Sequence, residues 1–136
     1  MEFMNKRVVF MGSPDFALPT LKALHRAYDV VGVVTQPDRP AGRGRAVQPP
    51  DVKILARALG LPIIQPTSLK NPEALQQLAA WHPDMIVVAA FGQILRENVL
   101  SLPPFGCVNV HASLLPRWRG AAPVQAAVLH DDVSGV

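Results

Sequence analysis

The hydrophobic pattern alternates between short apolar runs and longer segments in which apolar residues recur at helical spacing. The continuous apolar runs, which predict buried strands, lie at residues 7–11, 30–34, 63–64, 85–90 and 107–110. The segments that predict helices lie at residues 15–26, 51–60, 71–80 and 121–130. Strands that are apolar on both faces and alternate with helices are typical of a parallel sheet covered on both sides. The sequence therefore predicts a doubly wound α/β fold with a mostly parallel sheet.

Two of these helices carry boundary signals. Asp51 is expected to cap the helix at residues 51–60, and Gly60 lies where that helix should end. Asn71 is expected to cap the helix at residues 71–80, with Pro72 at its first position.

Residues 36–50, QPDRPAGRGRAVQPP, interrupt the alternation. They contain four prolines, two glycines and three arginines, so they can form neither a helix nor a central strand. The segment is also longer than a usual connection between a strand and a helix. We predict a functional basic loop that contacts phosphates, and a solvated insertion without function is the alternative.

A polar cluster follows the last predicted strand, at the end of the sheet where doubly wound folds bind ligands. Asn109 and His111 are two positions apart, so their side chains are expected to leave the same face. An amide N–H can stabilise a developing oxyanion, and an imidazole can exchange protons near neutral pH. The pair therefore suits acyl transfer to an amine, with a structural histidine as the alternative.

Two other strand ends bear on the choice of ligand. Residues 89–95, AAFGQIL, combine a tight turn at Gly92 with apolar neighbours, which suits the edge of a flat heterocycle or, alternatively, ordinary core packing. The first strand is followed by a single glycine, Gly12, where a dinucleotide-binding fingerprint has three. Binding of NAD or ATP is therefore not favoured.

Composition narrows the class of protein. The formal net charge of +3 fits a partner that carries phosphates. Cys107 is the single cysteine, which excludes an internal disulfide and a cysteine-based metal cage. No apolar run is long enough to span a bilayer, and no signal peptide is visible. We expect a cytoplasmic protein without a metal, a membrane contact or an obligate protein partner. The second methionine, Met4, suggests that residues 1–3 are a cloning remnant.

Four segments together resemble the methionyl-tRNA formyltransferase family: VFMGSPDFA, VVTQPDRPAGRG, GQIL and NVHASLLPRWRGAAPVQ. The resemblance extends over residues 6–136. The segment NVHASLLPRWRG alone is similar to the wider group of folate-dependent formyltransferases. The segment TQPDRPAGRG is more discriminating, because it resembles the inserted loop by which the tRNA enzymes reach the acceptor arm.

The resemblance implies a Rossmann-like domain that passes the formyl group of 10-formyltetrahydrofolate to the α-amino group of initiator methionyl-tRNA for translation initiation. It implies that Asn109 and His111 are catalytic. It also implies that the tRNA-facing loop carries Arg39, Arg43 and Arg45. The residues implied to line the folate pocket are Gln93, Ile94, Leu95, Ser113, Leu114, Leu115 and Pro116.

Part of the family pattern has no match in residues 4–136. The missing parts are a third catalytic residue (an aspartate in a later loop), the final strands of the sheet and a C-terminal β-barrel domain. The expectation is an incomplete N-terminal domain with weak or no activity by itself. A folate- or RNA-binding fragment without turnover is one alternative, and a formyltransferase acting on a nucleotide-sugar amine is another. A Rossmann-type dehydrogenase is a more distant possibility.

Overall fold

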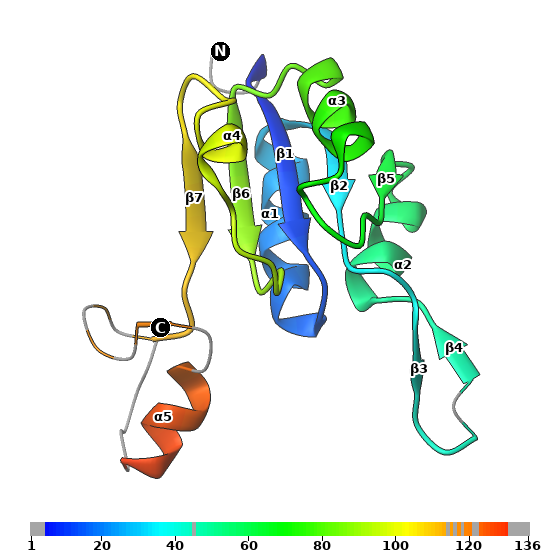
Figure 1. Ribbon diagram of the computed structural model, residues 1–136, viewed down its shortest axis with the longest axis vertical. Coiled ribbons are helices and arrows are strands. Elements are labelled where there is room, and N and C mark those ends of the chain that lie inside the picture. Colours follow the sequence, from blue (N-terminus) through cyan, green and yellow to red (C-terminus); the bar gives the residue numbers. More distant parts are fainter. Residues whose placement is uncertain are drawn as a thin grey trace.

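A five-stranded sheet forms the centre of the molecule, with strand order β5-β2-β1-β6-β7 (Figure 1). The computed structural model describes residues 5–44, 46–113, 115, 117, 119–120 and 123–130. The strands are β1 (Arg7–Gly12), β2 (Asp29–Val34), β5 (Ile63–Ile64), β6 (Met85–Ala89) and β7 (Cys107–Val110). All four neighbouring pairs in this sheet are parallel. The predicted doubly wound α/β fold is confirmed.

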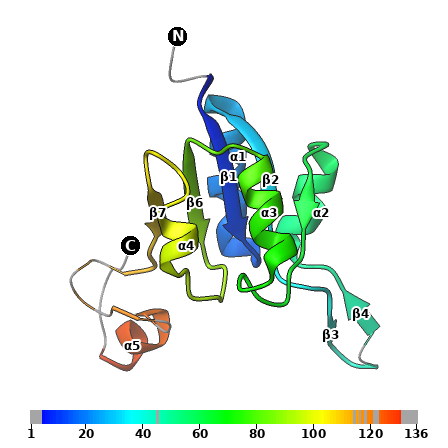
Figure 2. The ribbon, with the colours of Figure 1, turned by 45° about the horizontal axis from the view of Figure 1, so that its top comes forward.

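Helices cover both faces of the sheet (Figures 1 and 2). One face packs against α1 (Leu18–Ala27), which follows the short 3₁₀ helix η2 (Asp15–Ala17), and against α2 (Asp51–Ala58). The other face packs against α3 (Pro72–Ala80) and α4 (Glu97–Leu100). A further helix, α5 (Pro123–Leu129), lies apart from both layers. None of the helices among the described residues is long and apolar enough to cross a membrane.

The core consists of two clusters, one on each face, and β1 contributes to both. Val8 and Phe10 belong to the cluster under α1 and α2, whereas Val9 and Met11 belong to the cluster under α3 and α4. All four side chains are completely buried. Alternate residues of a strand point to opposite faces, so an uninterrupted apolar run is what a doubly covered strand requires.

The order of the strands reverses between β1 and β6. The chain proceeds from β1 outward through β2 to β5, then returns to the other side of β1 to form β6 and β7. Crevices that bind ligands form beyond the carboxyl ends of the strands at such a reversal. The loops after β1, β2, β6 and β7 meet at this end of the sheet.

The segment at residues 36–50 forms a β-hairpin outside the main sheet. Strands β3 (Arg39–Ala41) and β4 (Ala46–Gln48) pair antiparallel as a separate sheet. At its tip Gly42 and Gly44 have φ angles of +73° and +82°, which glycine adopts without strain. The prediction that residues 36–50 form neither a helix nor a central strand is confirmed. The pairing of β3 with β4 was not predicted.

Two sequence expectations about the secondary structure are wrong. Asp51 does not cap α2, because the helix begins at Asp51 itself and the cap position is occupied by Pro50. Strand β7 is not buried on both faces: Val108 is 50% exposed, since β7 lies at the edge of the sheet. Asn71 does cap α3, because its side chain accepts a hydrogen bond from the Glu73 N–H at 3.0 Å.

Candidate active site at the carboxyl end of the sheet

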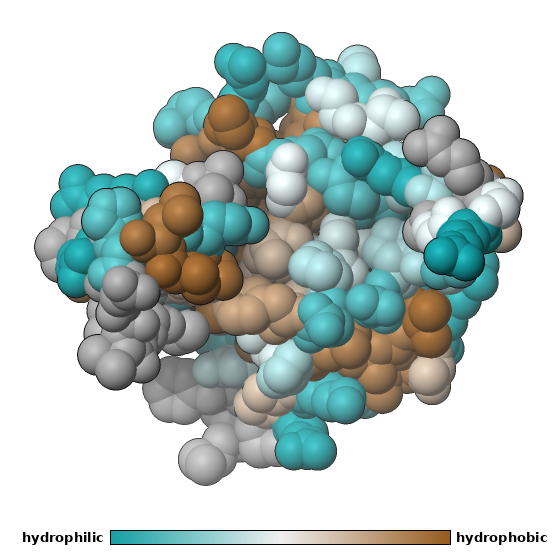
Figure 3. Space-filling view, turned by 90° about the horizontal axis from the view of Figure 1, so that it is seen from below, coloured by the Kyte–Doolittle hydropathy of each residue, from teal (hydrophilic) through white to brown (hydrophobic). Residues whose placement is uncertain are grey.

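The hairpin and α5 project from the carboxyl end of the sheet, on opposite sides of it (Figures 1 and 2). Figure 3 looks onto this end. It shows strongly hydrophilic atoms on the hairpin side and an apolar patch on the side of α5. The exposed apolar residues of α5 are Val124, Val128 and Leu129. The loop that follows β6 lies between these projections, and the chain after β7 leads to α5; most of the predicted site residues belong to these two stretches.

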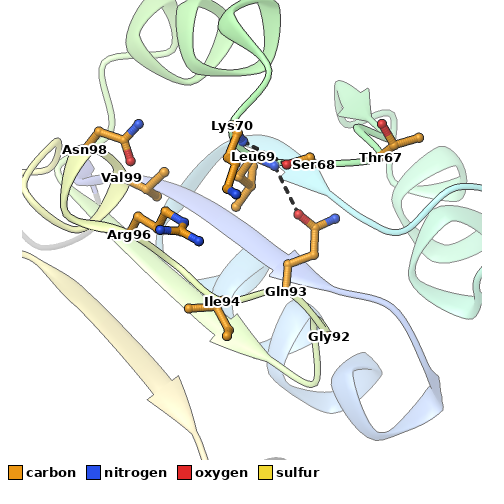
Figure 4. A pocket seen from close by; sticks show the side chains of 10 residues that line it. All are labelled: Thr67, Ser68, Leu69, Lys70, Gly92, Gln93, Ile94, Arg96, Asn98 and Val99. Carbon is orange, nitrogen blue, oxygen red and sulfur yellow. Dashed lines mark hydrogen bonds between the residues drawn. The ribbon is translucent and has the colours of Figure 1, made fainter.

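A pocket of about 330 Å³ opens where the loop after β6 faces the loop before α3 (Figure 4). Its lining residues are Thr67, Ser68, Leu69, Lys70, Gly92, Gln93, Ile94, Arg96, Asn98 and Val99. The wall at residues 92–94 falls within the predicted AAFGQIL segment. The wall at residues 67–70 was missed, because no local motif distinguishes it from an ordinary connection.

Gln93 holds the two walls of this pocket together. Its Oε1 accepts a hydrogen bond from the Leu69 N–H at 3.1 Å, and its Nε2 donates to the Pro66 carbonyl at 3.2 Å. Nε2 also lies 3.4 Å from Oε1 of Gln36. The side-chain amide is thus engaged by the protein itself. Its predicted place in the folate pocket stays a prediction, and the structure adds a role in fixing the pocket walls.

The residues beside Gln93 lie in different environments. Ile94 lines the pocket and is 85% exposed, which leaves its side chain available to a flat ligand. Leu95 packs against the core under α3 and α4, and Phe91 is part of that core. Gly92 has a φ of +86°, so the expected tight turn is present. Among these neighbours Ile94 is therefore the apolar side chain best placed to touch a ligand.

Two cationic side chains reach into the pocket from opposite walls. Lys70 precedes α3 and Arg96 precedes α4, and Figure 4 shows both side chains directed toward the middle of the pocket. None of the described residues that line the pocket is acidic. Like charges that converge without a carboxylate suit an anionic ligand group.

Asn109 and His111 lie at the end of β7, beside the end of β6. Asn109 pairs with Val88 and Val110 pairs with Ala89, so His111 is the first residue beyond the sheet. The Asn109 side chain is exposed and makes no hydrogen bond within the described part of the chain. The two side chains are not hydrogen-bonded to each other. Their predicted catalytic roles stay predictions.

The imidazole of His111 is held from both sides. Nδ1 lies 2.7 Å from Oγ of Ser113, and Nε2 lies 3.3 Å from the carbonyl oxygen of Gly120. A carbonyl can only accept, so in the neutral ring Nε2 carries the proton and Nδ1 accepts from the Ser113 hydroxyl. His111 therefore presents an N–H donor at Nε2.

The remaining predicted site residues are spread over this end of the molecule. Ser113 is buried, at 3% exposure, and its hydroxyl faces His111, whereas Leu115 is 60% exposed. Arg39 and Arg43 are exposed on the hairpin. Leu114, Pro116 and Arg45 lie outside the described residues. No group of residues that could hold a metal ion occurs among those described.

The family profile for formyl transferases matches residues 6–136. The chain belongs to the formyl transferase family. Over 122 residues it is 61% identical to a methionyl-tRNA formyltransferase of Xylella fastidiosa strain M23, covering 90% of this chain and 40% of that protein. It is 53% identical over 131 residues to that of Macrococcus caseolyticus, covering 96% of this chain and 42% of that protein. The chain thus spans about two fifths of the length of these relatives. The predicted membership of the formyl transferase family is confirmed.

Solved structures share the fold of this chain. A phosphoribosylglycinamide formyltransferase from Bacillus halodurans superimposes with a TM-score of 0.69 at 21% identity, covering 93% of this chain and 66% of that one. A formyltetrahydrofolate deformylase from Pseudomonas putida KT2440 gives a TM-score of 0.63 at 23% identity, covering 93% of this chain and 45% of that one. At these identities the similarity concerns the fold alone.

Among the described residues, two ionisable side chains have shifted pKa values. A hydrogen bond from Gln65 and one from Lys53 lower the pKa of Asp38 below its ordinary value. Burial raises the pKa of the Cys107 thiol. Because a thiolate is the reactive form of cysteine, the raised pKa argues against a nucleophilic role for Cys107.

Proposed function

We propose that the protein is a methionyl-tRNA formyltransferase, which transfers the formyl group of 10-formyltetrahydrofolate to the α-amino group of initiator methionyl-tRNA. The observation that carries this proposal is the 61% identity to a relative of that name over 90% of the chain. Since initiator methionyl-tRNA serves translation initiation, we place the activity in the cytoplasm as part of the same proposal.

The pocket between the loops at residues 67–70 and 92–96 is the proposed donor site. Folates combine a flat heterocycle with a tail that ends in carboxylates. Ile94 supplies an exposed apolar surface for a ring, while Lys70 and Arg96 supply positive charge for carboxylates. A few polar groups placed around an apolar contact are usual for small-molecule sites.

Asn109 and His111 are the proposed catalytic residues. When the amine attacks the formyl carbon, the formyl oxygen gains negative charge, which N–H donors can stabilise. The Asn109 amide has no partner within the described part of the chain, and the His111 Nε2–H makes only a long bond to Gly120, at 3.3 Å. Both donors are therefore available for this oxygen. Transfer of the proton that the amine loses needs the other neutral tautomer, in which Nδ1 donates to the Ser113 hydroxyl and Nε2, released from Gly120, is free to accept a proton.

The basic hairpin supports a nucleic-acid acceptor over a small one. Arg39 and Arg43 are exposed on a projection beside the carboxyl end of the sheet, where they can reach phosphates of a bulky substrate. A small amine, such as that of a nucleotide sugar, does not require a projection of this kind.

A formylation assay with the full-length protein tests the proposal. Radioactive 10-formyltetrahydrofolate is supplied with methionyl-tRNA, with glycinamide ribonucleotide or with an amino-sugar nucleotide, and the formylated product is identified. The expected result is turnover with methionyl-tRNA, which His111→Ala abolishes. Turnover only with one of the small amines would show that methionyl-tRNA is not the acceptor. Binding of the donor without any product would favour a binding protein instead.

A further inference from the structure

Among its described residues, the hairpin β3–β4 has no hydrophobic core of its own. The residues of β4 are exposed, and Val47 is 64% exposed. A two-stranded hairpin by itself is marginally stable in water. The direction in which Arg39 and Arg43 point therefore depends on the contacts at the base of the hairpin.

An ion pair closes that base. Nζ of Lys53 lies 3.0 Å from each carboxylate oxygen of Asp38. Asp38 directly precedes β3, and Lys53 belongs to α2, which follows β4, so the pair joins the two ends of the segment that forms the hairpin. Lys53 is buried, at 8% exposure. The side chain of Asp38 is 32% exposed, so the pair is partly buried, and swinging the hairpin away from the body would leave the Lys53 ammonium group without this partner.

A second element of the body holds the same carboxylate. Nε2 of Gln65, just after β5, donates to Oδ1 of Asp38 at 2.6 Å and to the Gln36 carbonyl at 3.1 Å. Asp38 is thus fixed from α2 and from the edge of the main sheet. The side chain of Gln36 continues the connection, because its Nε2 donates to the Phe91 carbonyl at 2.8 Å, in the loop that forms one wall of the pocket.

We propose that Asp38 is a positioning residue for the RNA-carrying substrate: held by Lys53 and Gln65, it sets the orientation of the arginine-bearing hairpin relative to the pocket. This inference rests on the proposed function. Asp38 acts through the hairpin and touches neither substrate. It governs the affinity for methionyl-tRNA, and it leaves the chemical step and the affinity for the formyl donor unchanged.

The test variant is Asp38→Asn combined with Lys53→Met in the full-length protein, which removes both charges and leaves no buried ion without a partner. If the released hairpin spends about a tenth of its time in the binding orientation, KM for methionyl-tRNA rises about tenfold. The values of kcat and of KM for 10-formyltetrahydrofolate stay within about twofold, since neither depends on the hairpin.

Two further variants separate positioning from general damage. Lys53→Arg keeps the ion pair and should retain the original KM for methionyl-tRNA. Asp29→Asn removes the Arg7–Asp29 pair, which spans 3.9 Å at the opposite end of the sheet, and should change none of the constants. Trypsin cleavage after Arg43 reports on the hairpin without any need for turnover, and it should become faster only in the double variant.

The outcomes are distinct. No formylation by the unaltered protein would overturn the proposed function and, with it, this inference. Formylation by the unaltered protein, with an unchanged KM for methionyl-tRNA or unchanged cleavage after Arg43 in the double variant, would overturn the inference alone. A lower kcat together with a higher KM for 10-formyltetrahydrofolate in the double variant would also overturn it, because both changes would show that the whole site is disturbed.

Discussion

The hydroxyl of Ser113 lies 2.7 Å from Nδ1 of His111, in a residue that is 3% exposed. Resemblance to the family implies that Ser113 is part of the folate pocket, whereas the structure turns its hydroxyl toward the imidazole. By donating to Nδ1, Ser113 leaves the proton of the neutral ring on Nε2. The serine thereby sets which nitrogen of His111 is the donor.

Ser113→Ala should therefore slow the chemical step. The loss of one hydrogen bond is worth about 1 kcal/mol, which corresponds to a decrease in kcat of about fivefold. The values of KM for both substrates should change little, because the proposed binding residues stay in place. Steady-state kinetics of the full-length protein measures this. Ser101→Ala, which removes an exposed hydroxyl bonded to the Glu97 carbonyl, is the control and should change neither kcat nor KM. A rise in KM for the folate donor without a change in kcat would instead place Ser113 in the donor pocket.

Gly32 makes room for the indole ring of Trp81 on the face of β2. A methyl group built on Gly32 would overlap the ring atoms of Trp81. Gly32→Ala should lower the free energy of unfolding by about 2 kcal/mol, the usual cost of overpacking a core. Denaturant unfolding followed by circular dichroism measures the change. Combining it with Trp81→Leu should recover part of the loss, and additive losses would show that the two residues do not compete for the same space.

The fold was predictable from the sequence because β1, β2 and β6 are continuous or nearly continuous apolar runs, which need cover on both faces, and because helical segments alternate with them. Features of the fold that leave no hydrophobic pattern could not be predicted from the sequence. The pairing of β3 with β4 involves exposed residues, and α4 is too short to show a helical period. At the site, the sequence indicated the stretches after β6 and β7. It could not indicate that residues 67–70 form the opposite pocket wall, or that Asp38 pairs with Lys53, because these contacts depend on how distant loops meet.

The cations of the pocket give a prediction about the formyl donor. Lys70→Ala combined with Arg96→Ala should raise KM for 10-formyltetrahydrofolate by up to about thirtyfold, because each of two partly exposed ion pairs with a carboxylate contributes up to about 1 kcal/mol. The effect should shrink as the salt concentration rises. Steady-state kinetics at two salt concentrations measures both effects.

A matched pair of cations provides the control for this double variant. Lys22 and Arg26 are exposed on α1, on the opposite face of the sheet, so replacing both with alanine changes the net charge equally. This control should leave the donor KM unchanged. An equal rise in both double variants would mean that the net charge of the protein matters and that the pocket cations have no specific role.

The attachment of the hairpin should depend on pH in one direction. Hydrogen bonds from Gln65 and Lys53 lower the pKa of Asp38, and the nearby Arg57 acts in the same sense. A carboxyl group whose pKa is lower in the folded state contributes stability above its ordinary pKa, and this contribution is lost as the pH falls through the folded value. The hairpin should therefore stay attached at neutral pH and loosen only in acid, below the ordinary pKa of aspartate. NMR shifts of the Val47 amide, followed during an acid titration, would show this step. In Asp38→Asn the step should be missing, and an unchanged step there would assign the titration to another group.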